Sequence, residues 1–316
     1  MEKILLCRTD GIGDLLLITP LIKEIKNIMK SSFIAVLASP NSKYVLLNNP
    51  DVDEIIEFPS DNLINIISSK NFTKAYIIYP RFSIALLLFL SGVKYRVGTA
   101  YRWYSFLFNR RVKIHRRYNQ MHEADYNLKL AEDIIGVKKA ERLFFYLTDE
   151  EMNEAKKYLK VKGISPDYFI IYPGGAGSAK NLCLENYALL IDIIKEKFPE
   201  IDILIASGKN EQNKVLYLYD KVKNKKNIFV MDENLTIREL AAVIHNCKIF
   251  ISGSTGPMHI AAALNVKTLT FFPEKGVIPV RWGPIGNISE IILFKNEKID
   301  FDYFIDRLQI LLKRKK

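Results

Sequence analysis

The sequence is poor in cysteine and histidine, and it contains no long hydrophobic run. Its three cysteines stand in no CxxC or Cys/His spacing, which argues against a cysteine-ligated metal site and is typical of a reducing compartment. The longest apolar run, residues 84–90, has seven residues, whereas a membrane-spanning helix needs ~20. The first residues lack the basic segment and cleavage site of a signal peptide. We therefore expect a cytoplasmic protein that does not cross a membrane.

Acidic residues are missing from residues 63–122, although this segment contains eleven lysines and arginines, a number equal to the net charge of +11 for the whole chain. Eight of these basic residues fall between residues 94 and 117, where six aromatic residues are interleaved with them. Such a segment attracts polyanions, for example anionic lipid head groups or a phosphorylated substrate. No nucleic-acid motif accompanies the charge, so nucleic acid is not an expected partner. A solvated basic face without a partner is the alternative.

The apolar pattern alternates between strand-like and helix-like segments in both halves of the chain, which is typical of a mostly parallel sheet covered by helices on both faces. A chain of 316 residues is long enough for two such domains. We predict two doubly wound α/β domains over 1–150 and 151–316, with the boundary between about 138 and 165. Strands are expected at residues 4–7, 33–38, 54–58 and 75–79, and at 168–172, 201–206, 228–230, 248–251 and 266–272.

Three loops at expected strand ends carry residues suited to chemistry, because ligands of doubly wound sheets bind beyond the carboxyl ends of the strands. The first loop runs from Arg8 to Asp14, and its two glycines, Gly11 and Gly13, allow a tight turn. Asp14 stands where a helix should begin, so its carboxylate is placed to act as a general base. The alternative is that Asp14 only caps the helix.

The second loop, residues 172–180, combines glycines with a hydroxyl and a lysine ahead of a helix. It lacks the residue order of the NTPase P-loop. Backbone N–H groups around Gly174 and Gly175, together with Ser178 and Lys180, would nevertheless bind the oxygens of a phosphate. A purely structural turn is the alternative.

The third loop, residues 252–259, ends a strand and begins a helix. Gly256 permits a close approach of the backbone, and Pro257 suits the first position of a helix. The N–H groups at this helix start offer a second anion site. His259 follows on the helix, and a lone histidine there is more often structural than functional.

Together, the three loops resemble glycosyltransferase family 9, the bacterial heptosyltransferases that build the inner core of lipopolysaccharide. The resemblance rests on residues 4–14 with Thr19-Pro20, on residues 173–180 with the following Glu185-Asn186-Tyr187-Ala188, and on residues 255–264. These segments stand in the family's order and span both halves of the chain. Each motif alone is modest evidence, whereas three in order are specific.

The resemblance implies a GT-B fold, in which two Rossmann-like domains face each other across a cleft. It also implies that the N-terminal domain binds the acceptor, that the C-terminal domain binds a nucleotide sugar, and that the last helix packs back on the N-terminal domain. Transfer would be inverting, and it would require neither a metal ion nor a cofactor. A lysine and helix N-termini would stabilise the departing diphosphate in place of a metal.

The resemblance assigns roles to individual residues as well. Asp14 matches the catalytic base, Lys180 the residue that contacts the donor phosphate, and Glu211 the acidic contact to the donor ribose. The other donor-binding candidates surround these positions and comprise Gly174, Gly175, Ser178, Ser254, Thr255, Gly256, Pro257 and His259. The acceptor-binding candidates are Arg8, Gly13, Arg102, Arg110 and Arg111.

Two departures from the family pattern leave the substrate open. Ser254 stands where the family usually has aspartate, and Leu182-Cys183 stands where it usually has Trp-Pro. Because a missing carboxylate changes the contacts to sugar hydroxyls, the expected donor is ADP-heptose or a related nucleotide sugar. The expected acceptor is an anionic glycolipid of the inner core, reached by peripheral contact with the inner face of the inner membrane.

Two other classes remain as alternatives. A nicotinamide-dependent oxidoreductase would show G-x-G-x-x-G with an acidic residue ~20 positions further on, but Leu16 occupies the third glycine position. A non-catalytic sugar- or lipid-binding protein of the same fold is compatible with Ser254. A kinetic comparison with Asp14→Asn discriminates that module from an enzyme.

Overall fold

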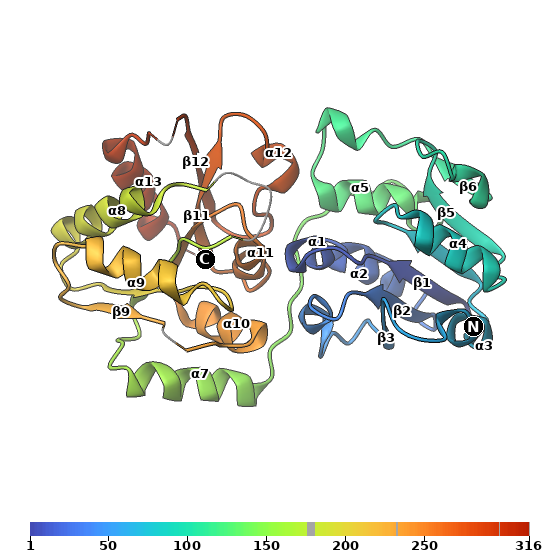
Figure 1. Cartoon of the computed structure of the whole chain (residues 1–316), viewed down its shortest axis with the longest axis horizontal. Helices are drawn as coiled ribbons and strands as arrows, with labels where there is room; N and C mark the ends of the chain where they lie inside the picture. Colours follow the sequence, from blue (N-terminus) through green and yellow to red (C-terminus); the bar gives the residue numbers. More distant parts are fainter. Residues whose placement is uncertain (176–180, 232, 297, 316) are drawn as a thin grey trace. The chain divides into compact units, whose positions relative to one another are not determined.

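The computed structural model describes residues 1–175, 181–231, 233–296 and 298–315. The chain divides into two compact units, Met1–Tyr146 and Leu147–Lys316, and each unit has its own parallel sheet (Figure 1). The division falls inside the boundary range expected from the sequence. Within the described ranges, no helix is both long enough and apolar enough to span a membrane.

The sheet of unit 1 consists of β1 (Lys3–Cys7), β2 (Phe33–Ala38), β3 (Glu54–Glu57), β4 (Lys74–Ile77), β5 (Tyr95–Thr99) and β6 (Arg110–Val112). Its strands are parallel and follow the order β3-β2-β1-β4-β5-β6. β1 lies inside the sheet because its residues from Ile4 to Cys7 are all apolar and fully buried. The loop that follows β1 therefore starts from a fixed point.

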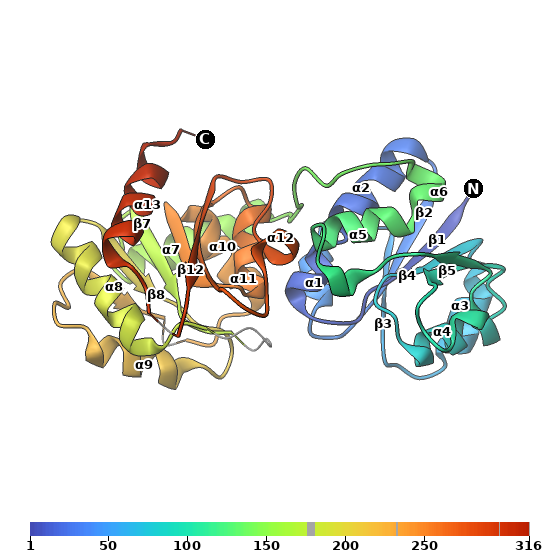
Figure 2. The same ribbon diagram turned by 90° about the horizontal axis from the view of Figure 1, so that it is seen from above.

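Helices cover both faces of this sheet. They are α1 (Ile12–Leu16), α2 (Thr19–Ile28), α3 (Leu63–Lys70), α4 (Phe82–Leu90), α5 (Glu123–Leu130) and α6 (Glu132–Ile135), with the short 3-10 helices η1 (Lys43–Leu46), η2 (Ser105–Leu107) and η3 (Arg116–Tyr118). Figure 2 shows α2, α5 and α6 on one side of the sheet and α3 and α4 on the other. Pro20 lies in the first turn of α2, so it marks the start of that helix and does not kink it.

The sheet of unit 2 consists of β7 (Tyr168–Tyr172), β8 (Asp202–Ile205), β9 (Ile228–Val230), β10 (Ile249–Gly253), β11 (Lys267–Pro273) and β12 (Ser289–Phe294). The strands are again parallel, in the order β12-β11-β10-β7-β8-β9. β10 and β7 occupy the middle, so the loops that follow these two strands are neighbours at the carboxyl edge of the sheet.

The helices of unit 2 are α7 (Asp149–Val161), α8 (Leu184–Lys197), α9 (Gln212–Lys221), α10 (Ile237–Asn246), α11 (Gly256–Ala263), α12 (Pro279–Trp282) and α13 (Phe301–Lys313). α8, α9 and α13 bury apolar side chains against one face of the sheet, and α7, α10 and α11 pack on the other. Thr148 caps α7 in a capping box with Glu151, as the sequence of this segment predicts.

The packing of the last helix, α13, is described within unit 2, and the expectation that it packs on the N-terminal domain stays a prediction. α13 belongs to unit 2, where Phe304, Leu308 and Leu311 are buried in the same core as β10 and β11. Phe304 stacks against Phe271 of β11, with the ring centroids 6.0 Å apart. The apolar face of α13 thus packs against the core of unit 2.

Candidate active site

The loop after β1 holds a buried arginine that is bound to three carboxylates. Arg8 donates from Nε to Asp10 Oδ1 at 2.7 Å, from Nη2 to Asp14 Oδ1 at 2.7 Å and from Nη1 to Glu123 Oε1 at 3.0 Å. The three carboxylates together raise the pKa of Arg8 above its usual value, although burial alone would lower it. Arg8 therefore stays protonated and fixes the positions of all three acids.

Asp14 is the most exposed of the three carboxylates. It is the third residue of α1, and its side chain is 30% exposed. The N-cap of α1 is Gly11, without a side-chain hydrogen bond, so the interpretation of Asp14 as a helix cap is wrong. The short turn through Gly11 and Gly13 brings Asp14 back toward Arg8. A partly exposed carboxylate fixed at a strand end is able to accept a proton from a bound hydroxyl.

Asp10 is the second carboxylate of this loop, and the sequence analysis did not select it. Burial raises the pKa of Asp10 to about 6, the positive charge of Arg8 opposes this shift, and the negative charge of Asp14 adds to it. Asp10 therefore takes up a proton as the pH falls toward 6.

Helix α5 supplies residues that the sequence analysis also missed. Glu123 begins α5 and is buried, and Asn127 lies one turn further on, also buried. Asn127 Oδ1 accepts from Arg8 Nη1 at 3.3 Å. Glu123 is the first acidic residue after the acid-free segment 63–122. The position of Glu123 directly after the acid-free segment is the sequence signal that could have identified it as a partner of arginine.

The basic candidates of unit 1 separate into two groups. Arg102, Arg110 and Arg111 are exposed. Among the described residues, no hydrogen bond or ion pair joins these three arginines to Arg8 or to the carboxylates that bind it. Arg116 instead donates to Glu123 Oε1 at 3.1 Å and to Asn127 Oδ1 at 3.2 Å. Gly13 is buried inside α1.

In unit 2, the loop after β10 leads directly into helix α11. Thr255 caps this helix by accepting a hydrogen bond from the backbone N–H of Met258 at 3.4 Å. Gly256 and Pro257 form its first turn, and His259 is buried in the next residues. Ser254 is partly exposed just before the cap. The remaining N–H groups of this turn carry the partial positive charge of a helix N-terminus.

The loop after β7 lies against the carboxylate of Glu211. Glu211 Oε1 accepts from the backbone N–H of Gly175 at 3.4 Å and from Lys214 Nζ at 2.7 Å. A Cβ atom on Gly174 would collide with the Glu211 carboxylate, so only glycine allows this close approach. The structure thus brings Glu211, Gly174 and Gly175 together.

Asn181 connects the loops after β7 and β10, and the sequence analysis did not select it. Its Nδ2 donates to the backbone carbonyl of Gly174 at 3.4 Å. A Cβ atom on Gly175 would collide with its amide nitrogen, and one on Gly253 would lie 2.6 Å from its amide oxygen. The two loops therefore share one polar side chain. Ser178 and Lys180 lie outside the described residues.

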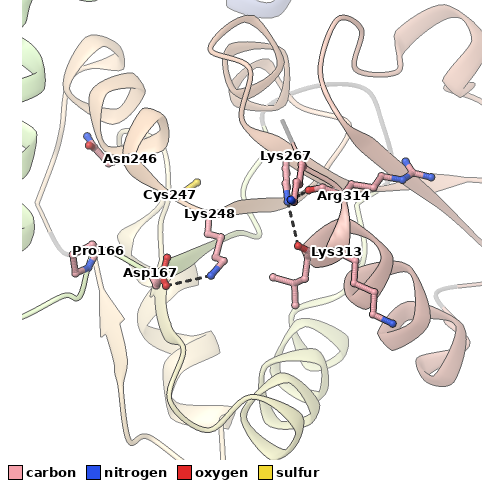
Figure 3. A pocket seen from close by; sticks show the side chains of 10 residues that line it. Pro166, Asp167, Asn246, Cys247, Lys248, Lys267, Lys313 and Arg314 are labelled. Carbon is pink, nitrogen blue, oxygen red and sulfur yellow. Dashed lines mark hydrogen bonds and ion pairs between the residues drawn. The ribbon is translucent and has the colours of Figure 1, made fainter.

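A cavity of about 520 Å³ in unit 2 lies at the other edge of the sheet (Figure 3). Lys248, which precedes β10, and Lys267, the first residue of β11, line it. The candidate donor-binding residues follow the carboxyl ends of the strands, so this cavity contains none of them. Among the described residues, no cluster of three His, Cys, Asp or Glu side chains is arranged to hold a metal ion.

Comparisons with known proteins agree with the fold. The chain is 27% identical over 312 residues to a Haemophilus influenzae protein named as a glycosyltransferase, a match that covers 93% of this chain and 89% of that protein. The solved structure of a family 9 glycosyl transferase from Veillonella parvula has a TM-score of 0.84 at 16% identity and covers 98% of this chain, with 97% of its own chain matched. ADP-heptose lipopolysaccharide heptosyltransferase II of E. coli has a TM-score of 0.82 at 17% identity, with coverage of 99% and 98%.

These likenesses confirm the predicted GT-B fold class. The model of "Glycosyltransferase family 9 (heptosyltransferase)" matches residues 62–303, which include the unit 2 loops and begin after the Arg8–Asp14 loop. This match sets aside the oxidoreductase alternative. The chain belongs to glycosyltransferase family 9, the heptosyltransferase family.

Proposed function

We propose that this chain transfers a heptose, or a related sugar, from an ADP-sugar to an anionic acceptor of the lipopolysaccharide inner core, with inversion and without a metal ion. Family membership supports the reaction class. The observation that carries the mechanism is the Asp14 carboxylate, which is partly exposed at the carboxyl end of β1 while the Arg8 that holds it is buried. A reactive group on a fixed, buried support suits general-base catalysis.

In this reaction, Asp14 accepts the proton of an acceptor hydroxyl as the hydroxyl oxygen attacks the anomeric carbon of the donor sugar. The new C–O bond forms on the face opposite the breaking bond to the diphosphate, which inverts the anomeric configuration. ADP leaves with the electron pair of the broken bond, and its added negative charge requires stabilisation. Asp14 passes its proton to solvent before the next turnover.

The donor is assigned to unit 2. The N-terminus of α11, capped by Thr255, suits the diphosphate because its N–H groups and helix dipole favour anions. Glu211, already held by Lys214 and Gly175, suits the ribose hydroxyls as a hydrogen-bond acceptor. The resemblance assigns Lys180 to the diphosphate as well. Lys180→Ala should weaken ADP binding and leave the melting temperature unchanged.

Ser254 bears on the identity of the sugar. Its hydroxyl is neutral and carries a donor as well as acceptors, whereas a carboxylate only accepts. The Ser254 hydroxyl can donate a hydrogen bond to an oxygen of the sugar, which a carboxylate cannot do. A sugar that accepts a hydrogen bond at this position would therefore suit Ser254 better than a sugar whose hydroxyl must donate to a carboxylate. The proposal therefore includes sugars related to heptose.

The acceptor side includes a peripheral membrane contact by unit 1. Arg102, Arg110, Arg111 and Arg117 are exposed, and the large aromatic side chains Trp103 and Phe106 stand exposed among them. Such a surface concentrates an enzyme at an anionic lipid surface. This contact would place the enzyme on the inner face of the inner membrane, where its lipid-linked acceptor is made.

The test is ADP release from ADP-heptose and other ADP-sugars in the presence of an inner-core glycolipid. Asp14→Asn should lower kcat by ~100-fold or more without changing the KM of the donor. Asp53→Asn is the matched control, because Asp53 is a similarly exposed carboxylate of unit 1 that is paired with Lys26. Wild-type turnover by Asp14→Asn would overturn the role of Asp14. Donor binding without transfer by the unaltered chain would favour the non-catalytic alternative.

A further inference from the structure

Glu123 and Asn127 bind Arg8, and Arg116 binds both of them, yet the proposed reaction assigns these three residues no step. We infer that these three are positioning residues, which hold the Arg8 guanidinium from its buried side so that Arg8 presents the Asp14 carboxylate to the acceptor. The inference rests on the proposed role of Asp14 as the base.

The carboxylates bound to Arg8 differ in solvent exposure, so one side of the guanidinium faces a buried carboxylate and the other a partly exposed one. The Glu123 side chain is only 2% exposed, whereas that of Asp14 is 30% exposed, and both bind the same guanidinium. Glu123 is therefore too deeply buried to touch a substrate, and Asp14 is accessible to one. Because a guanidinium is planar and rigid, fixing its Nη1 on Glu123 also fixes the orientation of Nη2 toward Asp14.

Arg116 and Asn127 make the buried side rigid. Both guanidiniums, those of Arg8 and Arg116, donate to the same two acceptors, Glu123 Oε1 and Asn127 Oδ1. At its other end, the Asn127 amide donates from Nδ2 to the carbonyl of Leu17 at 3.0 Å. An amide bound at both ends cannot turn over, so α5 is tied to the segment that carries Asp14.

The charges of the group couple Glu123 to the pH dependence of the reaction. Two arginines face three carboxylates, so one negative charge is in excess when all are ionised. The carboxylates around Arg8 are Asp10 and Asp14 of the β1–α1 segment and Glu123 of α5. Arg116 of η3 is paired with Glu123. The ring of Tyr79, which follows β4, faces the guanidiniums of both Arg8 and Arg81. Protonation of Asp10, whose pKa burial raises to about 6, would release Arg8 Nε and direct more of the positive charge onto Asp14. We therefore expect transfer to decline below about pH 6.

Loss of the Glu123 charge should shift this decline. With Glu123→Gln, the charge of Arg8 is less neutralised, so the pKa of Asp10 falls and the acid limb of the kcat profile moves to lower pH. The plateau kcat should fall ~10-fold because Arg8 becomes a stronger and less well oriented partner of Asp14, while the KM of the donor stays unchanged. Glu123→Asp, which keeps the charge, should keep the acid limb in place.

The control is Glu151→Gln in unit 2, because Glu151 is also bound to an arginine, Arg238. A purely structural ion pair of this kind should affect the melting temperature and leave the pH profile unmoved. If Glu123→Gln fails to fold, Asn127→Ala takes its place, with the same expected loss of kcat. Unchanged kcat and pH profile in the folded variant would overturn the inference.

A double-mutant cycle separates this inference from the proposed function. Glu123→Gln should cost nothing further in kcat when it is combined with Asp14→Asn, because Glu123 acts through Asp14. A full additive loss in the double variant would mean that Glu123 acts elsewhere, and it would overturn the positioning role alone. Undiminished turnover by Asp14→Asn by itself would instead defeat the proposed base.

Discussion

Phe82 and Trp103 pack against each other with their ring centroids 4.8 Å apart, although Trp103 is 73% exposed and Phe82 is 40% exposed. The buried ring of Tyr104 meets both of them edge-on, at 5.8 and 5.5 Å. The pair is thus held rigidly at the surface by a ring that belongs to the core of unit 1. Rigid, exposed aromatic side chains beside arginines suit the interface of an anionic membrane.

Charge reversal in the basic segment 94–117 should abolish binding to anionic vesicles. Arg110, Arg111 and Arg117 are exposed, and each would contribute ~1 kcal/mol at an anionic surface. The triple Arg→Glu variant should lose co-sedimentation with phosphatidylglycerol vesicles at low salt, and added salt should weaken binding of the unaltered chain. Arg116 is left intact because it binds Glu123. Lys→Glu at Lys156, Lys160 and Lys223, which are exposed in unit 2, is the control. Equal loss in both variants would indicate a nonspecific effect of charge.

The protonation of Asp10 should contribute to the pH dependence of stability. Burial raises its pKa from the ordinary ~3.9 to about 6. Between these values the folded state binds the proton more tightly than the unfolded state does. The contribution of Asp10 is therefore greatest below pH ~4 and declines as the pH rises to about 6, by about 3 kcal/mol. Asp10→Asn should remove this decline in urea unfolding measured from pH 4 to 7, and parallel curves for the two proteins would contradict it.

Gly175→Ala should weaken ADP binding. The added methyl group would collide with the Asn181 amide and lie 3.3 Å from Thr255 Cγ2, so it would displace the loop that faces α11. We expect the Kd for ADP to rise ~10-fold in calorimetry, which corresponds to ~1.4 kcal/mol. Adding Asn181→Ala to the same chain removes the collision and should restore part of the affinity. Unaltered ADP binding by Gly175→Ala would place the nucleotide away from this loop.

Sugar transfer should continue in EDTA. The proposal assigns stabilisation of the departing diphosphate to backbone N–H groups at α11 and to Lys180, groups that a chelator does not affect. Initial rates with and without EDTA should agree, and added magnesium or manganese should not raise them. Loss of transfer in EDTA with recovery on addition of either metal would contradict a metal-independent reaction.

Buried strands were the best-predicted part of the fold. The predicted ranges of β2, β7 and β9 match the observed ones, because these strands consist almost entirely of β-branched, aromatic and other apolar residues. β5, β6 and β12 were not predicted. β6 has three residues, two of them exposed arginines, and it lies at the sheet edge, so no apolar run indicates it. In β5, Gly98 is required because the ring of Phe108 occupies the space of a Cβ atom, a packing relation that composition does not show.

The candidate site was predictable where its residues are close in sequence. Arg8 and Asp14 lie within seven positions, and the two glycines between them signal the turn, whereas Asp10 of the same loop was not selected. Glu123 and Asn127 lie more than 100 residues away from Arg8, and only the packing of α5 beside α2 brings them near. Likewise, no local pattern indicates that Asn181 contacts a loop more than 70 residues further along the chain. Short-range motifs selected Arg8 and Asp14, whereas the contacts of Glu123 and Asn127 with Arg8 depend on tertiary structure.

The end of α13 is fastened to the sheet by a buried ammonium group. Lys267 begins β11, and its Nζ donates to the carbonyl of Leu311 at 2.7 Å. The same Nζ also donates to the carbonyl of Arg314 at 2.5 Å (Figure 3). A buried ammonium is stable only while such acceptors compensate its charge. Ending the chain at residue 310 would therefore do more than remove a helical turn. It would leave the Lys267 ammonium buried in unit 2 without the carbonyl oxygens that accept its hydrogen bonds. The last residues of α13 thus supply the hydrogen-bond acceptors for a lysine of a strand that begins more than 40 positions earlier.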